Sequence, residues 1–341
     1  MAVTIRQVAE AAGVSIGTAS MVLNGKAPRH AERTRRRVLD AAQRLGYRPN
    51  SFRWALRTGR FNAVGLLVGT RSGTSTLFDD FWAIQDELRV RDQHLIVASI
   101  PDDQLTDPRR LPRIFREWSV DGLLIKYSSH LPPRMVELVR ESGMPAVWLN
   151  SRQPADCVFP DDLNASREAA RRLLALGHRR VGYLAFVTEG HYSTHDRARG
   201  CQEVWREAGL TPCVAAVDSL SHMTLPATDR GELARQLLAG PDRVTAVVAY
   251  EADEALSAYQ TALQLGLRVP QDLSIVTFSP RPVVLGDFVV ATWVIPFFEV
   301  GKTAARLLLE RIARPETPPS PPRPIPLELT GSGSLGPAPQ G

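Results

Sequence analysis

The chain has 341 residues, of which 44% are hydrophobic and 23% charged, a balance typical of globular proteins in a chain too long for one ordinary core. From this length we expect two or three domains. The sequence contains no apolar run of transmembrane length and no secretion signal, so we expect no membrane segment and a cytoplasmic location. The three cysteines are odd in number and lack metal-ligand spacing, which indicates reduced thiols.

Basic charge is concentrated at the N-terminus. Residues 1–60 hold twelve Lys or Arg side chains against three acids, a net charge of +9, whereas the whole chain carries +5 and the other 281 residues therefore −4. A merely solvated surface would mix its signs, while a basic module is typical of proteins that displace counterions from nucleic-acid phosphates. The sequence thus indicates a nucleic-acid-binding module followed by a larger body.

Two short helices are predicted within this module. Thr4 and Gln7 have the spacing of a capping box, so a helix should begin at residue 5, and Gly13 offers the backbone conformation that ends it. Ser15 can cap a second helix, which Asn24-Gly25 closes after barely three turns. A tight Gly-Val-Ser turn joins the two, which predicts a helix-turn-helix whose second helix enters the DNA major groove.

A third helix is predicted over residues 32–45, followed by a stop at Gly46. Four of its side chains are expected to face inward: Val38, Leu39, Ala42 and Leu45. Its first turns carry four arginines, where positive charge opposes the helix dipole, so phosphate contact explains them better than helix stability does. These are Arg33, Arg35, Arg36 and Arg37. Residues 51–60 are too short and basic to hold a helix alone.

The motifs TIRQVAEAAGVSIGTASMVLNG and TRRRVLDAAQRLGYRPN, followed by Leu56, resemble the N-terminus of the lactose/galactose-repressor (LacI/GalR) family of bacterial transcription regulators. The resemblance implies a hinge that becomes helical on operator DNA, where Leu56 would wedge between base pairs of the minor groove. This chain has Arg53-Trp54 where the family usually has Ala-Arg. Trp54 could be a second wedge, a dimer contact or a residue packed on the next domain.

Base readout is expected from Ile16, Gly17 and Met21, at the start and outer face of the second helix, with neighbouring hydroxyl groups on phosphates. Relatives commonly carry a polar or basic residue at the position of Met21, so this operator should be read through thymine methyl groups. The expected DNA contacts are Thr4, Ser15, Ile16, Gly17, Thr18, Ser20, Met21, Asn24, Arg33, Arg35, Asn50, Arg53 and Leu56.

From residue 61 short apolar runs alternate with amphipathic helices. Strands are expected at 63–69, 94–99, 121–125 and 146–149, and again at 181–186, 213–217, 244–250 and 273–278. This alternation predicts an α/β fold of two lobes, each a doubly wound parallel sheet, with a ligand cleft at the carboxyl ends of the strands. Motifs such as VDGLLI and LGLRVPQDLSIVTF also resemble the family's periplasmic-binding-protein-like effector domain.

The expected domains are a helix-turn-helix head over residues 1–47, a hinge over 48–60, a two-lobed effector-binding and dimerisation domain over 61–330 and a disordered tail over 331–341. A last helix should span 301–314, and a final strand should follow the Pro-rich run that ends at Pro326. No leucine heptads follow residue 314, so no tetramerisation segment is expected.

The resemblance also implies an effector site. Arg197 stands where the family has an arginine that reaches the effector, and Asp253 stands at the aspartate of its Asn-Asp pair. Phe78 and Ser279 complete the expected contacts, whereas Asp161 and Asp162 are read as a helix cap. Polar groups common in relatives are replaced, by Ala252, Ser279 and Pro280. We expect a modified sugar, a nucleoside-like molecule or another small polar metabolite as effector, or no effector at all.

No motif of a hydrolase, zinc protease, P-loop or dinucleotide-binding enzyme is present, and no enzyme activity or cofactor is expected. His191 and His195 lack a third metal ligand, and His178 is read as a structural turn residue. The sequence predicts a repressor that binds double-stranded, pseudopalindromic operator DNA as a homodimer at the bacterial nucleoid, with an effector between the lobes. An effector-independent regulator and a solute-binding receptor are the alternatives.

Overall fold

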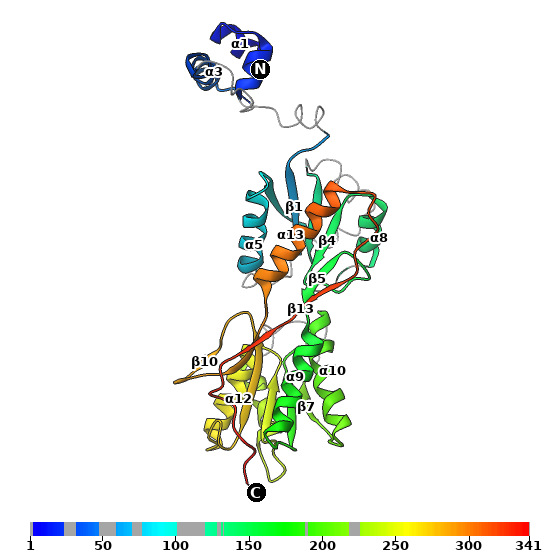
Figure 1. The fold of residues 1–341 in the computed structure, drawn as a ribbon. Helices are drawn as coiled ribbons and strands as arrows, with labels where there is room; N and C mark the ends of the chain where they lie inside the picture. The colour runs from blue at the N-terminus through cyan, green and yellow to red at the C-terminus, as the bar shows by residue number, and fades with distance from the viewer. Residues whose placement is uncertain are drawn as a thin grey trace. The chain divides into compact units, whose positions relative to one another are not determined.

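The computed structural model describes residues 3–23, 32–47, 59–69, 77–100, 120–127, 131, 133–187, 190–217 and 226–340. The chain forms two compact units (Figure 1), a head of residues Met1–Phe61 and a body of residues Asn62–Gly341. No helix in these described ranges is long and apolar enough to span a bilayer.

The head contains the three predicted helices, α1 (Ile5–Ala12), α2 (Ile16–Leu23) and α3 (Glu32–Leu45). The capping box forms as predicted, because the Thr4 backbone N–H donates to Gln7 Oε1 over 2.8 Å and the Gln7 N–H donates to Thr4 Oγ1 over 3.5 Å. Gly13 ends α1 at a φ of 60°, and Ser15 Oγ accepts from the Thr18 N–H over 3.1 Å at the start of α2. Local capping signals therefore set the helix-turn-helix.

The core of the head is built from small side chains on all three helices: Val8, Ala9, Ala12, Ala19, Val22, Val38, Ala41 and Ala42. The prediction that Leu39 and Leu45 face inward was wrong, since they are 44% and 38% exposed. Val38, Ala41 and Ala42 lie three and four residues apart and share one face of α3, whereas Leu39 lies a step of about 100° away from Val38 around the helix axis. The buried face of α3 is therefore narrower than the face that its apolar residues define, because Leu39 and Leu45 lie outside it.

Lobe 1 of the body is a six-stranded sheet in the order β13-β5-β4-β3-β1-β2, with every neighbouring pair parallel. Its strands are β1 (Ala63–Gly69), β2 (His94–Ile100), β3 (Gly122–Lys126), β4 (Ala146–Leu149), β5 (Cys157–Pro160) and β13 (Arg323–Ile325). The described part of this lobe includes the helices α5 (Leu77–Arg89), α8 (Pro133–Glu141) and α13 (Phe297–Ala313). Helices α5 and α13 lie side by side on one face of the sheet (Figure 1), where they cover alternate strand residues such as Leu66, Leu124 and Val147.

Lobe 2 is a second six-stranded sheet in the order β14-β12-β9-β8-β6-β7, parallel except for its edge strand β14. Its strands are β6 (Val181–Ala185), β7 (Cys213–Ala216), β8 (Ala246–Ala249), β9 (Ser274–Ser279), β12 (Ala291–Val294) and β14 (Glu328–Thr330). Helices α9 (Asp162–Ala175) and α10 (Tyr192–Glu207) cover one face, and α11 (Ala227–Leu238) and α12 (Ala252–Gln264) cover the other. The predicted pair of doubly wound sheets is confirmed.

Strands β5, β12 and β13 were not predicted, nor was the short hairpin of β10 (Val284–Leu285) and β11 (Phe288–Val289). The chain passes between the lobes three times, from β5 to α9, from β12 to α13 and from β13 to β14. Each lobe is therefore assembled from separate stretches of sequence.

The prediction of a disordered C-terminal tail was wrong, because residues 331–340 pack on lobe 2. Ser334 is fully buried, donates from Oγ to the Ile275 carbonyl over 2.5 Å and accepts from the Ala291 N–H over 2.8 Å. His178 is also fully buried and contacts the Gly336 carbonyl from Nε2 over 3.1 Å, which confirms its structural role. The tail has the composition of a disordered segment, but Ser334 forms hydrogen bonds with strands β9 and β12 and helps to hold it in place.

Candidate nucleic-acid interface and effector site

The outer face of α2 exposes apolar side chains. Ile16 is 45% exposed and Met21 is 43% exposed, while Ala19 and Val22 on the opposite face are buried in the head. Gly17, one helical turn before Met21, is also exposed. Ser15 and Thr18 share a hydrogen bond of 3.0 Å at the N-terminus of α2. Two large apolar side chains on a small basic domain are suited to contact with the methyl groups of thymine.

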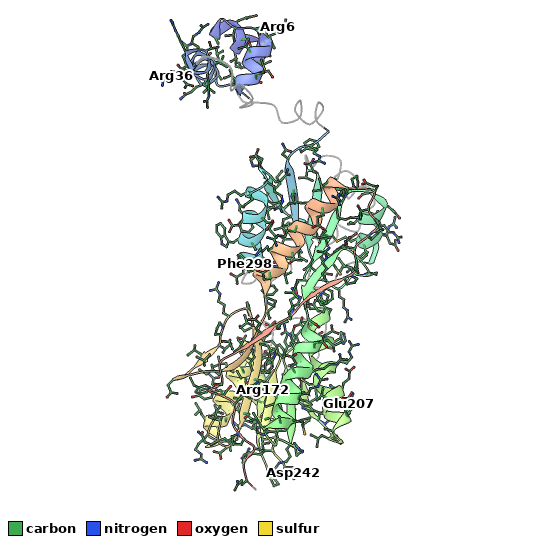
Figure 2. All side chains as sticks on the ribbon, viewed as in Figure 1. Arg6, Arg36, Arg172, Glu207, Asp242 and Phe298 are labelled. Atoms are coloured by element: carbon green, nitrogen blue, oxygen red, sulfur yellow. The ribbon has the colours of Figure 1, made fainter. Side chains whose placement is uncertain are left out.

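Arginines of α1 and α3 place positive charge on the surface of the head. Among the described residues, Arg6, Arg33 and Arg36 are exposed and have no ion-pair partner, and Arg6 and Arg36 project from the head (Figure 2). Arg35 lies 3.9 Å from Glu32, but both side chains are so exposed that the pair contributes little. These cations are available to phosphate oxygens.

Arg37 has a different role from the phosphate contact predicted for it. Its guanidinium donates from Nη2 to the carbonyls of Ala12 and Gly13, the latter over 3.1 Å, and so ties α3 to the turn of the helix-turn-helix. Thr4 is engaged in the cap of α1. The expected contacts Asn24, Asn50, Arg53 and Leu56 lie outside the described residues, as does the side chain of Phe78, a residue in the first turn of α5.

Arg197 lies at the carboxyl edge of the lobe 2 sheet, where α/β folds bind ligands. It is 2% exposed and donates from Nε to Asp162 Oδ1 and from Nη1 to the Tyr250 carbonyl, each over 2.7 Å. The guanidinium carbon also lies 4.8 Å and 4.7 Å from the ring centres of Tyr250 and Phe278. Burial by itself would lower the pKa of Arg197, but the charges of Asp162 and Glu251 outweigh burial and keep that pKa above its ordinary value.

Close packing of α9 against α10 brings Asp162 to this arginine. A Cβ atom at Gly200 would lie 2.6 Å from the Leu163 carbonyl, so only glycine permits the approach of the two helices. Asp161 caps α9 as expected, accepting from the Asn164 N–H over 3.3 Å. Asp162, read from the sequence as part of that cap, is instead the buried partner of Arg197.

Asp253 and Arg197 are not brought together. The Asp253 side chain is 57% exposed and pairs with Arg230 over 3.3 Å, whereas Glu251 lies 4.0 Å from Arg197 Nη1. Ser279 is buried at the end of β9 and accepts from the Arg281 N–H over 3.3 Å. Sequence reasoning did not assign Asp162 or Glu251 to this site, although each stands two residues after the end of a buried strand, where ligand groups of α/β folds gather.

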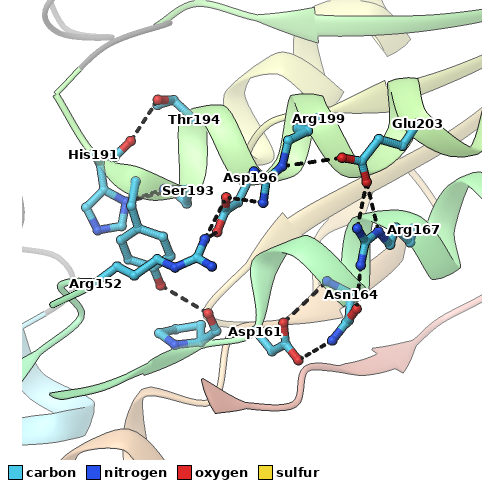
Figure 3. Close-up of polar contacts among 12 residues, drawn as sticks. Arg152, Asp161, Asn164, Arg167, His191, Ser193, Thr194, Asp196, Arg199 and Glu203 are labelled. Atoms are coloured by element: carbon cyan, nitrogen blue, oxygen red, sulfur yellow. Dashed lines mark hydrogen bonds and ion pairs between the residues drawn. The ribbon is translucent and has the colours of Figure 1, made fainter. Parts of the chain in front are cut away.

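A network of polar contacts links this region to lobe 1. Ser193 Oγ and the Tyr250 hydroxyl share a hydrogen bond of 2.9 Å, and His191 donates from Nε2 to the Asn150 carbonyl over 3.0 Å. Arg152, between β4 and β5, binds Asp196 of α10 over 2.7 Å. Figure 3 shows the contacts continuing from Asp196 through Arg199, Glu203 and Arg167. His191 thus caps α10 and bridges the lobes, and His195 is exposed.

Comparison with known protein families identifies one domain in the head and one in the body. Residues 4–50 match the model of the bacterial regulatory proteins of the lacI family, and residues 170–334 match a periplasmic binding protein-like domain. The transcriptional regulator AglR of Rhizobium meliloti (strain 1021) is 32% identical over 286 residues, which cover 81% of this chain and 77% of that protein. The regulator MalR of Streptomyces coelicolor is 31% identical over 328 residues, covering 93% and 92%.

Among solved structures, that of the lac repressor dimer bound to operator and the anti-inducer ONPF has the same fold, with a TM-score of 0.79 at 22% identity over 98% of this chain and 100% of that chain. A helix-turn-helix head followed by a periplasmic binding protein-like body is the architecture of a transcriptional regulator. The curated relatives of this chain are transcriptional regulators rather than enzymes. This chain belongs to the lacI family of bacterial regulatory proteins.

Proposed function

We propose that this protein is a repressor that binds a pseudopalindromic operator as a homodimer in the bacterial cytoplasm, and that a small molecule bound in the body sets its affinity for DNA. The observation that carries the proposal is the outer face of α2, where Ile16, Gly17 and Met21 are exposed on the same small domain as the unpaired arginines Arg6, Arg33 and Arg36. Apolar contacts would read the bases, and the arginines would hold the backbone.

The experiment is a binding selection from random DNA with the wild type and with Met21→Arg. Arginine prefers the acceptor edge of guanine, and one good base contact contributes about 1–3 kcal/mol of discrimination, so the preferred half-site should change at one or two positions. Leu39→Arg is the matched control: it adds the same charge at an equally exposed position on α3 and should leave the half-site unchanged. If Met21→Arg selected the wild-type half-site, α2 would not read the bases as proposed.

Exposed apolar side chains on the body support the homodimer. Leu256 and Leu263 of α12 are 40% and 57% exposed and lie two turns apart on one face of the helix. The β10–β11 hairpin of the same lobe exposes Val284 and Val289. In lobe 1, Trp82 of α5 is 56% exposed. A self-complementary surface of this kind would join two chains about a two-fold axis and so present two heads to two half-sites.

Replacing both Leu256 and Leu263 with glutamate should therefore give monomers in sedimentation. Operator affinity should fall at least about tenfold, because the second head would no longer bind at the high effective concentration that the first one creates. Val214→Glu, at a 48% exposed side chain on edge strand β7, should leave the dimer intact. A double variant that still sedimented as a dimer would show that α12 is not the interface.

The effector is proposed to bind where Arg197, Glu251 and the Ser193–Tyr250 pair meet at the carboxyl edge of the lobe 2 sheet. Nε and Nη1 of Arg197 are already engaged by Asp162 and Tyr250, so the arginine offers an effector few free donors. This supports a modified sugar, a nucleoside-like molecule or another small polar metabolite over a heavily hydroxylated hexose. A ligand bound here could change DNA affinity by favouring one arrangement of the lobes that Arg152 and Asp196 connect.

A further inference from the structure

Lobe 1 contains a pocket of about 330 Å³ that has no part in the effector site. It is lined by α8, the segment before β4, the loop before β5, the end of α13 and the Pro-rich segment that follows α13. Ala146 and Asp156 line it at the starts of β4 and β5, so it lies at the amino edge of the sheet, opposite the carboxyl edge that α/β folds use for ligands. Its size falls within the range of small-molecule sites.

The walls of the pocket are fixed by hydrogen bonds. Arg311, at the end of α13, donates from Nη1 to the carbonyls of Thr317 and Pro318, the latter over 3.0 Å. Asp156 and Ser320 exchange two bonds, from the Asp156 N–H to the Ser320 carbonyl over 2.8 Å and from the Ser320 N–H to Asp156 Oδ1 over 2.9 Å. The Pro-rich wall is therefore held in place before any ligand arrives, which lowers the ordering cost of binding.

The lining is apolar apart from Arg140, Gln153, Asp156 and Arg311. Val136 and Val139 of α8, Met144 and the buried Trp148 supply an apolar surface, on which an aromatic ring can contact both the indole and the methionine sulfur. Arg311 lies 3.8 Å from Asp156, so its charge is balanced, whereas the exposed Arg140 has no ion-pair partner in the described part of the chain. The pocket thus combines an apolar interior with one unbalanced cation.

We propose that this pocket is a second ligand site, which binds a small aromatic carboxylate with its ring against Trp148 and Met144 and its carboxylate toward Arg140. A pocket of about 330 Å³ lies at the lower end of the range of small-molecule sites, which suits one or two fused rings with a short acidic side chain. The proposal does not depend on the proposed operator binding or on the effector site of lobe 2.

The test measures binding of two probes to the full chain by calorimetry, 1-naphthaleneacetate and its neutral counterpart 1-naphthaleneacetamide. One naphthaleneacetate should bind per chain, about fivefold tighter than the amide, because one partly exposed ion pair contributes up to about 1 kcal/mol. Arg140→Gln should lower the affinity for naphthaleneacetate to the affinity for the amide. Arg134→Gln is the matched control, since Arg134 lies on the same helix but pairs with Glu137 and Glu141 outside the pocket.

Val136→Trp should fill the pocket and weaken both probes at least about tenfold. Because that variant could fail to fold, Arg140→Gln, at an exposed position, carries the test independently. The proposal is overturned if naphthaleneacetate shows no saturable binding to the wild type, if folded Val136→Trp binds as tightly as the wild type, or if the preference for the anion over the amide survives Arg140→Gln.

Discussion

Replacing Lys126 with methionine should lower the free energy of unfolding of the body by about 3–5 kcal/mol in urea denaturation. Lys126, at the end of β3, and Asp80, in the first turn of α5, are each 1% exposed, and Nζ lies 2.5 Å from Asp80 Oδ2. Burial raises the pKa of Asp80 and lowers the pKa of Lys126, while the ion pair opposes both shifts. Without the lysine, a carboxylate would be left in the interior without its counter-charge.

Two further variants separate the ion pair from simple packing. Adding Asp80→Asn to Lys126→Met should recover most of the loss, because the cost comes from an uncompensated charge rather than from the missing pair. Lys302→Met is the matched control: its ammonium group lies 3.4 Å from Glu299 with both side chains partly exposed, and its loss should change stability by less than about 1 kcal/mol. Equal effects of Lys126→Met and Lys302→Met would contradict this account.

Arg197→Met should have an effect of similar size, about 3–5 kcal/mol, and should lower the melting temperature of the body. The substitution leaves the buried Asp162 carboxylate without its partner and removes the donor to the Tyr250 carbonyl. Adding Asp162→Asn should restore part of the loss. Arg167→Met removes an arginine from the same pair of helices, but its partner Glu203 is 34% exposed, so the loss should stay below about 1 kcal/mol. If Arg197→Met unfolded like Arg167→Met, the buried pair would contribute nothing specific to stability.

This result bears on any search for the effector. Loss of ligand binding in an Arg197 variant would have two possible causes, the loss of a direct contact with the ligand and a change in the structure of lobe 2. The second cause arises because Arg197 holds α9, α10 and the end of β8 together. Glu251→Gln is the cleaner probe, because that side chain is 44% exposed and lies 4.0 Å from the same guanidinium. A ligand that loses affinity in Glu251→Gln without a change in melting temperature would bind at the proposed place.

The parts of the fold that could be predicted from the sequence are those set by neighbours in sequence. Thr4 and Gln7 cap each other three residues apart, and strands buried on both faces show as short apolar runs such as residues 63–69. Strand β13 was missed because its pairing with β5 joins Arg323 to Val158, which lie far apart in the sequence, and its own three residues include a proline. Short edge strands carry little local signal.

The candidate sites divide in the same way. The exposed face of α2 follows from helical periodicity once Ala19 and Val22 are placed inward, so Ile16 and Met21 could be named from the sequence. The role of Asp162 could not, because its contact with Arg197 depends on how closely α9 and α10 pack at Gly200. The order of the tail likewise depends on contacts between residues far apart in the sequence, such as those of Ser334 with the Ile275 carbonyl and the Ala291 N–H and that of Gly336 with His178.

Because the chain passes between the lobes three times, neither lobe can complete its core early in protein synthesis. Lobe 1 is completed only by α13 and β13, so its sheet face with Leu66, Leu124 and Val147 is covered only in part, by α5, until residues 297–325 have emerged from the ribosome. Lobe 2 waits in turn for β14 and Ser334. A nascent chain therefore exposes two unfinished cores almost to the end of its synthesis, and products truncated before residue 297 should depend on chaperones or be degraded.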